Sequence, residues 1–211
     1  MPVVTAIQSD PRGSGGFAIH ADGASFALVA ATDVRELGLA VGASLAPEQM
    51  QRVEGRAEVF AARLGAMRIL AYRALPAVEI QRRLVRKGHA PAAAGEAVGA
   101  LVVAGLINDE EFARHYARTR SSRFRYGPSR LARDLRRLGI GEEAAERAIR
   151  VAFEQEGVDA AGLMREAAAK KLQTLRDLDP VVRGRRLRTY LLRRGFAAAD
   201  VREVVKAALA G

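Results

Sequence analysis

Three glycines, each preceded by a helix with the same apolar spacing, recur along the chain and constrain its fold more than any other feature. Gly88, Gly139 and Gly195 are separated by 51 and 56 residues. Four and eight residues before each glycine stands a leucine or isoleucine, and one residue after it stands His89, Ile140 or Phe196. The paired apolar residues are Ile80 and Leu84, Leu131 and Leu135, and Leu187 and Leu191. A period of this length is typical of repeat proteins, in which each unit packs mainly on its neighbour.

Each repeat has room for three helices of ordinary length. Asn108, with Glu111 three residues later, has the spacing of a helix N-cap, and Gly127-Pro128 and Asp179-Pro180 each mark a helix start. Hydrophobic residues make up 49% of the chain but aromatics only 5%, which favours closely packed alanine-rich helices. The predicted helices span residues 57–74, 76–88 and 92–105; 109–125, 128–139 and 142–155; and 159–175, 180–195 and 198–210.

Residues 1–55 predict a different kind of structure. Val3 to Gln8 has the composition of a strand, and Asp22-Gly23 lies between two alternating apolar runs, which is typical of a β-hairpin. Asp33 and Glu36 stand at capping-box spacing in a short helix that ends at Gly38. We therefore expect a mainly α fold with three tandem three-helix repeats in an elongated curved array and a small N-terminal β-hairpin module. The expected divisions are 1–55, 56–107, 108–157 and 158–211.

The charge is strongly basic and unevenly placed. The chain has 34 Lys and Arg against 24 Asp and Glu, and only four of the 34 are lysines. A GC-rich coding sequence explains the ratio of arginine to lysine, but not where the charge lies. Residues 1–55 carry three basic and six acidic groups, and residues 56–211 carry 31 and 18. A basic body of this kind points to a polyanion or an acidic protein surface as partner.

The second helix of each predicted repeat carries most of this charge. The net charges of the three second helices are +3, +3 and +6, whereas the first repeat's third helix has no Lys or Arg. This pattern argues against a helix-turn-helix reader, whose last helix must carry the base-reading side chains. Three basic helices in register can form a cationic track, although a single arginine-rich face often serves only solubility. The candidate partner- or DNA-binding residues are Arg82, Arg86, Arg118, Arg120, Arg123, Arg125, Arg130, Arg133, Arg137, Arg185, Arg186 and Arg193.

Phe124 and Tyr126 lie among the arginines of the middle repeat. Arginine with interleaved aromatic rings suits phosphate contacts and base stacking. The same rings are equally compatible with a place in the hydrophobic core, and the sequence leaves both interpretations open.

The middle repeat resembles a known family. The segment Gly105-Leu-Ile-Asn-Asp-Glu-Glu-Phe-Ala113, followed by Arg120, Gly127-Pro-Ser-Arg-Leu-Ala-Arg-Asp-Leu135 and Gly139-Ile140, is similar to the signature of the RecX family, whose members regulate the RecA recombinase. The likeness covers about residues 56–211. It implies a regulator that binds in the groove of the RecA filament and inhibits strand exchange, ATP hydrolysis and co-protease activity, with roles in DNA repair and the SOS response. It also implies some affinity for single- or double-stranded DNA.

No residue pattern indicates catalysis. The chain has no cysteine, its three histidines have no ligand partners at metal spacing, and no Gly-x-x-x-x-Gly-Lys-Ser/Thr loop is present. We therefore expect a protein that is not an enzyme and needs no metal or cofactor. The longest uncharged apolar run, residues 97–107, is too short to span a bilayer, so a cytoplasmic protein without membrane contact is expected. We also expect it to be a monomer.

Two further hypotheses remain beside the filament regulator. The first is a general basic DNA-binding or architectural protein without a recombinase partner, which would show salt-steep affinity for naked DNA. The second is a scaffold that binds acidic proteins. DNA binding measured across salt, with and without RecA, separates the three.

Overall fold

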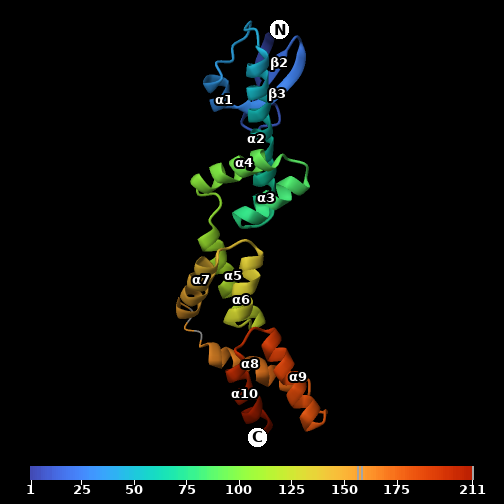
Figure 1. Ribbon diagram of the computed structural model, residues 1–211, viewed down its shortest axis with the longest axis vertical. Coiled ribbons are helices and arrows are strands. Elements are labelled where there is room, and N and C mark those ends of the chain that lie inside the picture. The colour runs from blue at the N-terminus through green and yellow to red at the C-terminus, as the bar shows by residue number, and fades with distance from the viewer. Residues whose placement is uncertain (156, 158, 211) are drawn as a thin grey trace. The chain divides into compact units, whose positions relative to one another are not determined.

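The structure is a computed structural model that describes residues 1–155, 157 and 159–210. The described residues form ten helices and one three-stranded sheet, so the prediction of a mainly α protein with a small N-terminal β module is confirmed (Figure 1). The chain divides into two compact units, residues 1–107 and 108–211, and each is considered by itself. No described helix combines the length and the apolar character needed to cross a membrane.

Unit 1 begins with an antiparallel sheet in the order β1-β2-β3, formed by β1 (Val4–Ser9), β2 (Gly16–Ala21) and β3 (Ala24–Ala30). The predicted hairpin at Asp22-Gly23 is confirmed. Both residues have positive φ, 48° and 79°, which is the backbone that a two-residue turn between twisted strands requires.

The short helix α1 (Ala31–Glu36) differs from the prediction at its start. Asp33 is not the N-cap residue but lies in the first turn, where its carboxylate accepts a hydrogen bond from the backbone N–H of Ala30 at 3.0 Å. The acid therefore takes part in capping from inside the helix, because the N-cap residue is Ala30, the last residue of β3, whose side chain cannot accept a hydrogen bond.

The long helix α2 (Pro47–Tyr72) connects two hydrophobic cores of unit 1. Its first half contributes Val53 to the core under the sheet, and its second half contributes Ala62 and Ala66 to a core shared with α3 (Ala77–Arg86) and α4 (Pro91–Val103). The predicted division between residues 55 and 56 therefore falls inside a continuous helix. The apolar residues that face the two cores follow one helical period, so the helix continues without a break across this division.

Unit 2 contains six helices in two groups of three. The first group is α5 (Asp109–Phe124), α6 (Pro128–Arg137) and α7 (Glu142–Gln155), and the second is α8 (Ala160–Gln173), α9 (Pro180–Arg193) and α10 (Ala198–Ala210). Each group encloses its own core of buried residues, with Phe153 packed against both. The boundary predicted between residues 157 and 158 involves position 158, which lies outside the described residues.

The glycine-centred repeat is present at the level of individual hydrogen bonds. Gly88, Gly139 and Gly195 all adopt left-handed φ angles, of 95°, 95° and 85°. In each case the residue after the glycine donates its N–H to the carbonyl of the second leucine of the pair, at 3.1–3.4 Å, which is the Schellman arrangement that ends a helix. The six paired apolar residues, which are Ile80, Leu84, Leu131, Leu135, Leu187 and Leu191, are all fully buried.

Candidate partner-binding surfaces

A basic groove lies between α6 and α9 in unit 2, and we call it the α6/α9 groove. The α6 side is formed by positions 130, 133, 134 and 137, which share one face of the helix because they are three or four residues apart. The groove has a volume of about 670 Å³. Its lining residues are Arg130, Arg133, Asp134 and Arg137 from α6 and Thr189, Leu192 and Arg193 from α9. Four of the predicted arginines, from two different repeats, therefore line one groove.

The two walls of the groove are joined through the backbone. The N–H of Gly127 donates to the carbonyl of Arg194 at 2.7 Å, and the N–H of Ser129 donates to the carbonyl of Gly195 at 3.2 Å. The start of α6 thus rests on the end of α9. A Cβ atom at Gly195 would lie 2.3 Å from the backbone nitrogen of Arg130, so only glycine permits this approach.

Arg130 stabilises this joint as well as lining the groove. Its guanidinium lies 4.1 Å from the centre of the Tyr126 ring and donates to the carbonyl of Arg193 at 3.0 Å. It also pairs with the carboxylate of Asp134 at 3.4 Å. The single acid of the groove is therefore held by an arginine that is itself fixed in place.

The other arginines of the groove are exposed. Arg133, Arg137 and Arg193 are all open to solvent. Arg185 and Arg186 are exposed one turn before Thr189 on α9, so they continue the same side of that helix beyond the groove. These side chains present positive charge to solvent on one side of the two helices.

The arginines of α5 and Arg125, which follows it, have a different environment, and no described residue of α5 lines the groove. The Arg120 guanidinium covers the rings of Tyr116 and Phe124, at 5.2 and 4.9 Å from their centres. Arg123 also lies over Phe124, at 5.7 Å. Arg125 pairs with Glu166 of α8 at 3.3 Å, and Arg118 lies 3.5 Å from Nδ1 of His115.

Three of the aromatic rings near these arginines pack on the core. Phe112, Tyr116 and Tyr126 pack against the buried residues of the α5–α7 bundle. Burial raises the pKa of the Tyr116 hydroxyl above its ordinary value of 10.0, with a smaller contribution from Asp134. Of the two rings for which the sequence left both interpretations open, Tyr126 packs on this core, whereas the half-buried Phe124 contacts Tyr126, Arg120 and Arg123 instead.

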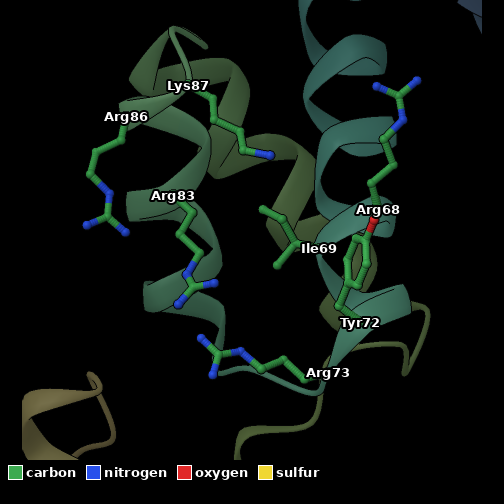
Figure 2. Close-up of a pocket in the computed structure, with 7 residues that line it drawn as sticks. All are labelled: Arg68, Ile69, Tyr72, Arg73, Arg83, Arg86 and Lys87. Carbon is green, nitrogen blue, oxygen red and sulfur yellow. The ribbon is translucent and has the colours of Figure 1, made fainter.

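A second basic opening, the α2/α3 pocket, lies in unit 1 and has a volume of about 380 Å³. Figure 2 shows the side chains of Arg73, Arg83 and Lys87 directed into the space between the two helices, with Ile69 at its floor. The predicted residue Arg86 lines the opening but extends from the outer side of α3. Its neighbour Arg82 is exposed on α3 and is not part of the lining.

Six of the seven lining residues of this pocket were absent from the predicted site, and, apart from the apolar Ile69, three of the six come from the end of α2 and the residue after it. Arg68, Tyr72 and Arg73 stand at the end of the first helix, whereas the prediction assigned the charge to second helices. The available signal was the helix-end spacing, since residues 68 and 72 are four apart and share a face that continues to Arg73 at the helix terminus. Two of the three are arginines and one is an aromatic.

Glu79 is the acid that accompanies the pocket's arginines. Its Oε1 atom accepts a hydrogen bond from Nε of Arg83 at 2.7 Å and lies 3.8 Å from Arg86. The hydrogen bond from Arg83 is the largest cause that lowers the pKa of Glu79 below its ordinary value of 4.5. Glu79 is therefore already occupied by two arginines.

A third opening has no net charge among its charged lining residues, which are Arg136, Arg150, Glu142 and Glu146. Among the described residues, no group of three or more His, Asp and Glu side chains could hold a metal ion. The fold and its two arginine-lined openings define a three-helix-repeat protein with basic surfaces in both units.

Comparison with known proteins identifies the family. Residues 108–149 match the family model described as "RecX, second three-helix domain". The regulatory protein RecX of Amycolatopsis mediterranei is 32% identical over 138 residues, which cover 65% of this chain and 77% of the relative. That of Halorhodospira halophila is 33% identical over 150 residues, covering 70% and 88%. The chain belongs to the RecX family of regulatory proteins.

Solved structures share the fold. A crystal structure of regulatory protein RecX matches with a TM-score of 0.78 and 23% identity, covering 98% of this chain and all of that one. The crystal structure of RecX from Lactobacillus salivarius matches with a TM-score of 0.59 and 19% identity, covering 71% and 96%. At these identities the likeness concerns the fold.

Proposed function

We propose that this protein is a non-enzymatic regulator that binds the RecA nucleoprotein filament through the α6/α9 groove and inhibits the recombinase. The observation that carries the proposal is the convergence of arginines from two repeats on one groove, in a chain of the RecX family. The filament groove, the inhibition of ATP hydrolysis, strand exchange and co-protease activity, and a cytoplasmic location follow from the family resemblance.

The physical basis is a match between a basic surface and a nucleoprotein polymer. A nucleoprotein filament presents phosphates and acidic side chains at regular intervals, and arginine binds both through paired N–H donors. Because two helices contribute to the groove, several such contacts can form at once. A regulator of this kind acts by occupancy, so it needs no catalytic residue.

The test measures the DNA-dependent ATPase of RecA on single-stranded DNA with increasing amounts of this protein. We expect inhibition at sub-stoichiometric amounts. The variant R133E/R137E/R193E should need at least about tenfold more protein for the same inhibition, because like charges facing each other at an interface cost several kcal/mol. The three positions are exposed, so the helical circular dichroism should stay unchanged.

A matched control keeps the net charge of that variant. Arg147, Arg176 and Arg202 are exposed on α7, after α8 and on α10, and none of them lines the groove. The variant R147E/R176E/R202E should inhibit like the wild type. Equal inhibition by both variants would remove the groove from the site. No effect of the wild type at equimolar protein, together with tight binding to naked DNA, would favour the general DNA-binding protein instead.

A further inference from the structure

The α2/α3 pocket holds positive charge that the folded chain does not neutralise. Within the described part of the chain, Arg73 and Lys87 form no ion pair, and both side chains point into the pocket (Figure 2). Glu79 is engaged by Arg83 and Arg86 and does not line the opening. Arg73 and Lys87 are both exposed, so their positive charges are available to an anion that enters the opening.

Tyr72 gives the pocket a second feature that charge alone does not explain. Its side chain is 91% exposed although it is a large aromatic residue. The ring stands at the edge of α2 beside Ile69, and Arg73 follows it in the chain (Figure 2). The three tyrosines of unit 2 differ, because they pack on a core. An exposed ring next to unpaired cations is the arrangement with which proteins bind single-stranded nucleic acid.

We propose that the α2/α3 pocket binds a single nucleic-acid strand. Arg73 and Lys87 contact phosphates of the strand, and a base stacks on the ring of Tyr72. A duplex does not fit this role, since its bases are already stacked on each other and only its phosphates are available. An acidic peptide would use the two cations and leave Tyr72 without a function, so the exposed ring favours the nucleic acid.

This inference is independent of the proposed function. It concerns unit 1, and its test contains no recombinase. The full-length protein is titrated into a fluorescein-labelled 20-nucleotide oligothymidylate, and binding is followed by fluorescence anisotropy at several salt concentrations. A second probe is an abasic oligomer of the same length, which keeps the phosphates and lacks the bases.

Charge reversal tests the phosphate contacts. The variant R73E/K87E should bind oligothymidylate at least about tenfold more weakly than the wild type near 0.1 M salt. The slope of log affinity against log salt should fall by about 1.4, because each lost contact to a single strand contributes roughly 0.7. The variant R147E/R202E has the same net charge and should bind like the wild type. Equal losses in the two variants would overturn the proposal.

The ring is tested separately. The variant Y72A should lose roughly 5- to 150-fold in affinity for oligothymidylate, which is the range for one stacked base, and nothing for the abasic oligomer. The variant Y72F should bind like the wild type, because stacking does not need the hydroxyl. Since Tyr72 is exposed, neither change affects the core.

Three results would count against a nucleic-acid site. The first is that the wild type shows no measurable binding of oligothymidylate. The second is that Y72A weakens the binding of both oligomers equally. The third is that polyglutamate competes as effectively as unlabelled oligothymidylate. The last result would assign the pocket to acidic protein segments. Retained oligothymidylate binding together with a failure to inhibit RecA would refute the proposed function and leave this inference standing.

Discussion

The two basic openings are built in different ways. The α6/α9 groove has one wall from each of two repeats, and backbone hydrogen bonds between Gly127 and Arg194 and between Ser129 and Gly195 join these walls. The α2/α3 pocket lies inside a single repeat, where the short connection between the two helices fixes its walls. The groove therefore depends on how two repeats fit together, and the pocket depends only on one helical pair.

The openings also differ in how much of their charge is available. In the groove, Arg130 makes three contacts within the protein, and its acid Asp134 is part of them. In the pocket, Arg73 and Lys87 make no ion pair among the described residues. A count of arginines thus overestimates the charge that a partner meets, because some guanidinium groups are used to join helices or to cover aromatic rings.

The largest effect is expected from closing the space at the joint between repeats. Gly195→Ala places a Cβ atom against the backbone of Arg130 and in a left-handed conformation. We expect a loss of about 2–5 kcal/mol in the free energy of unfolding, from backbone strain and overpacking together. Chemical denaturation followed by circular dichroism measures the loss, and hydrogen exchange locates it within residues 108–211.

Gly88→Ala is the matched control for this substitution. Gly88 has a similar left-handed φ of 95°, but a Cβ atom there meets nothing within 4 Å. We therefore expect only the conformational cost, about 1–2 kcal/mol. Equal losses for the two variants would show that the joint yields easily, and the groove would then not depend on the fit between repeats.

The repeat architecture could be predicted because its signals are local. The glycine after each second helix, the two apolar residues before it and the residue after it lie within ten positions, and together they indicate where the helix ends and which residues face the core. Asn108 is confirmed as an N-cap, since its side chain accepts the N–H of Glu111 at 2.9 Å. The start of α2 at Pro47 and the position of Asp33 depend on packing against the sheet, which short-range patterns do not contain.

The candidate site could be predicted only in part. The spacing of Arg130, Arg133 and Arg137 placed them on one face of a helix, and the groove brings Arg193 beside them. The contact of Arg130 with Tyr126 and with the carbonyl of Arg193 joins positions up to 63 residues apart, and no periodicity encodes it. For the same reason the sequence did not separate the arginines that bind within the protein from those that face solvent.

The next largest effect distinguishes these two kinds of arginine. Arg130→Ala removes the ring contact and the hydrogen bond at the joint, and we expect a loss of about 1–2 kcal/mol in the free energy of unfolding. Arg133→Ala, on the exposed side of the same helix, should change it by less than about 0.5 kcal/mol. Denaturant titration of both variants provides the measurement.

The inhibition assay then completes the comparison. Arg133→Ala should weaken the inhibition of RecA while leaving stability intact, which separates partner contact from folding. If Arg130→Ala proves as stable as the wild type, the joint does not rely on its side chain and the backbone hydrogen bonds alone hold the two repeats together.

The smallest effect concerns pH and belongs to the pocket. Arg83 lowers the pKa of Glu79 in the folded protein, so the carboxylate adds stability above its unfolded pKa near 4.5 and loses that contribution as the pH falls through the lower folded value. Glu79→Gln should therefore unfold about 1–2 °C below the wild type at pH 7, as expected for an i,i+4 pair worth about 0.5 kcal/mol. The difference should shrink as the pH falls below 4.5, and melting curves between pH 7 and pH 3 measure it.

Glu110→Gln removes a longer and more exposed pair with Arg114, at 3.8 Å, and should change the midpoint of thermal unfolding less. If the difference between wild type and Glu79→Gln persisted at pH 3, the Glu79 side chain would act through packing. Glu79 would then not be the ionic partner of Arg83 and Arg86.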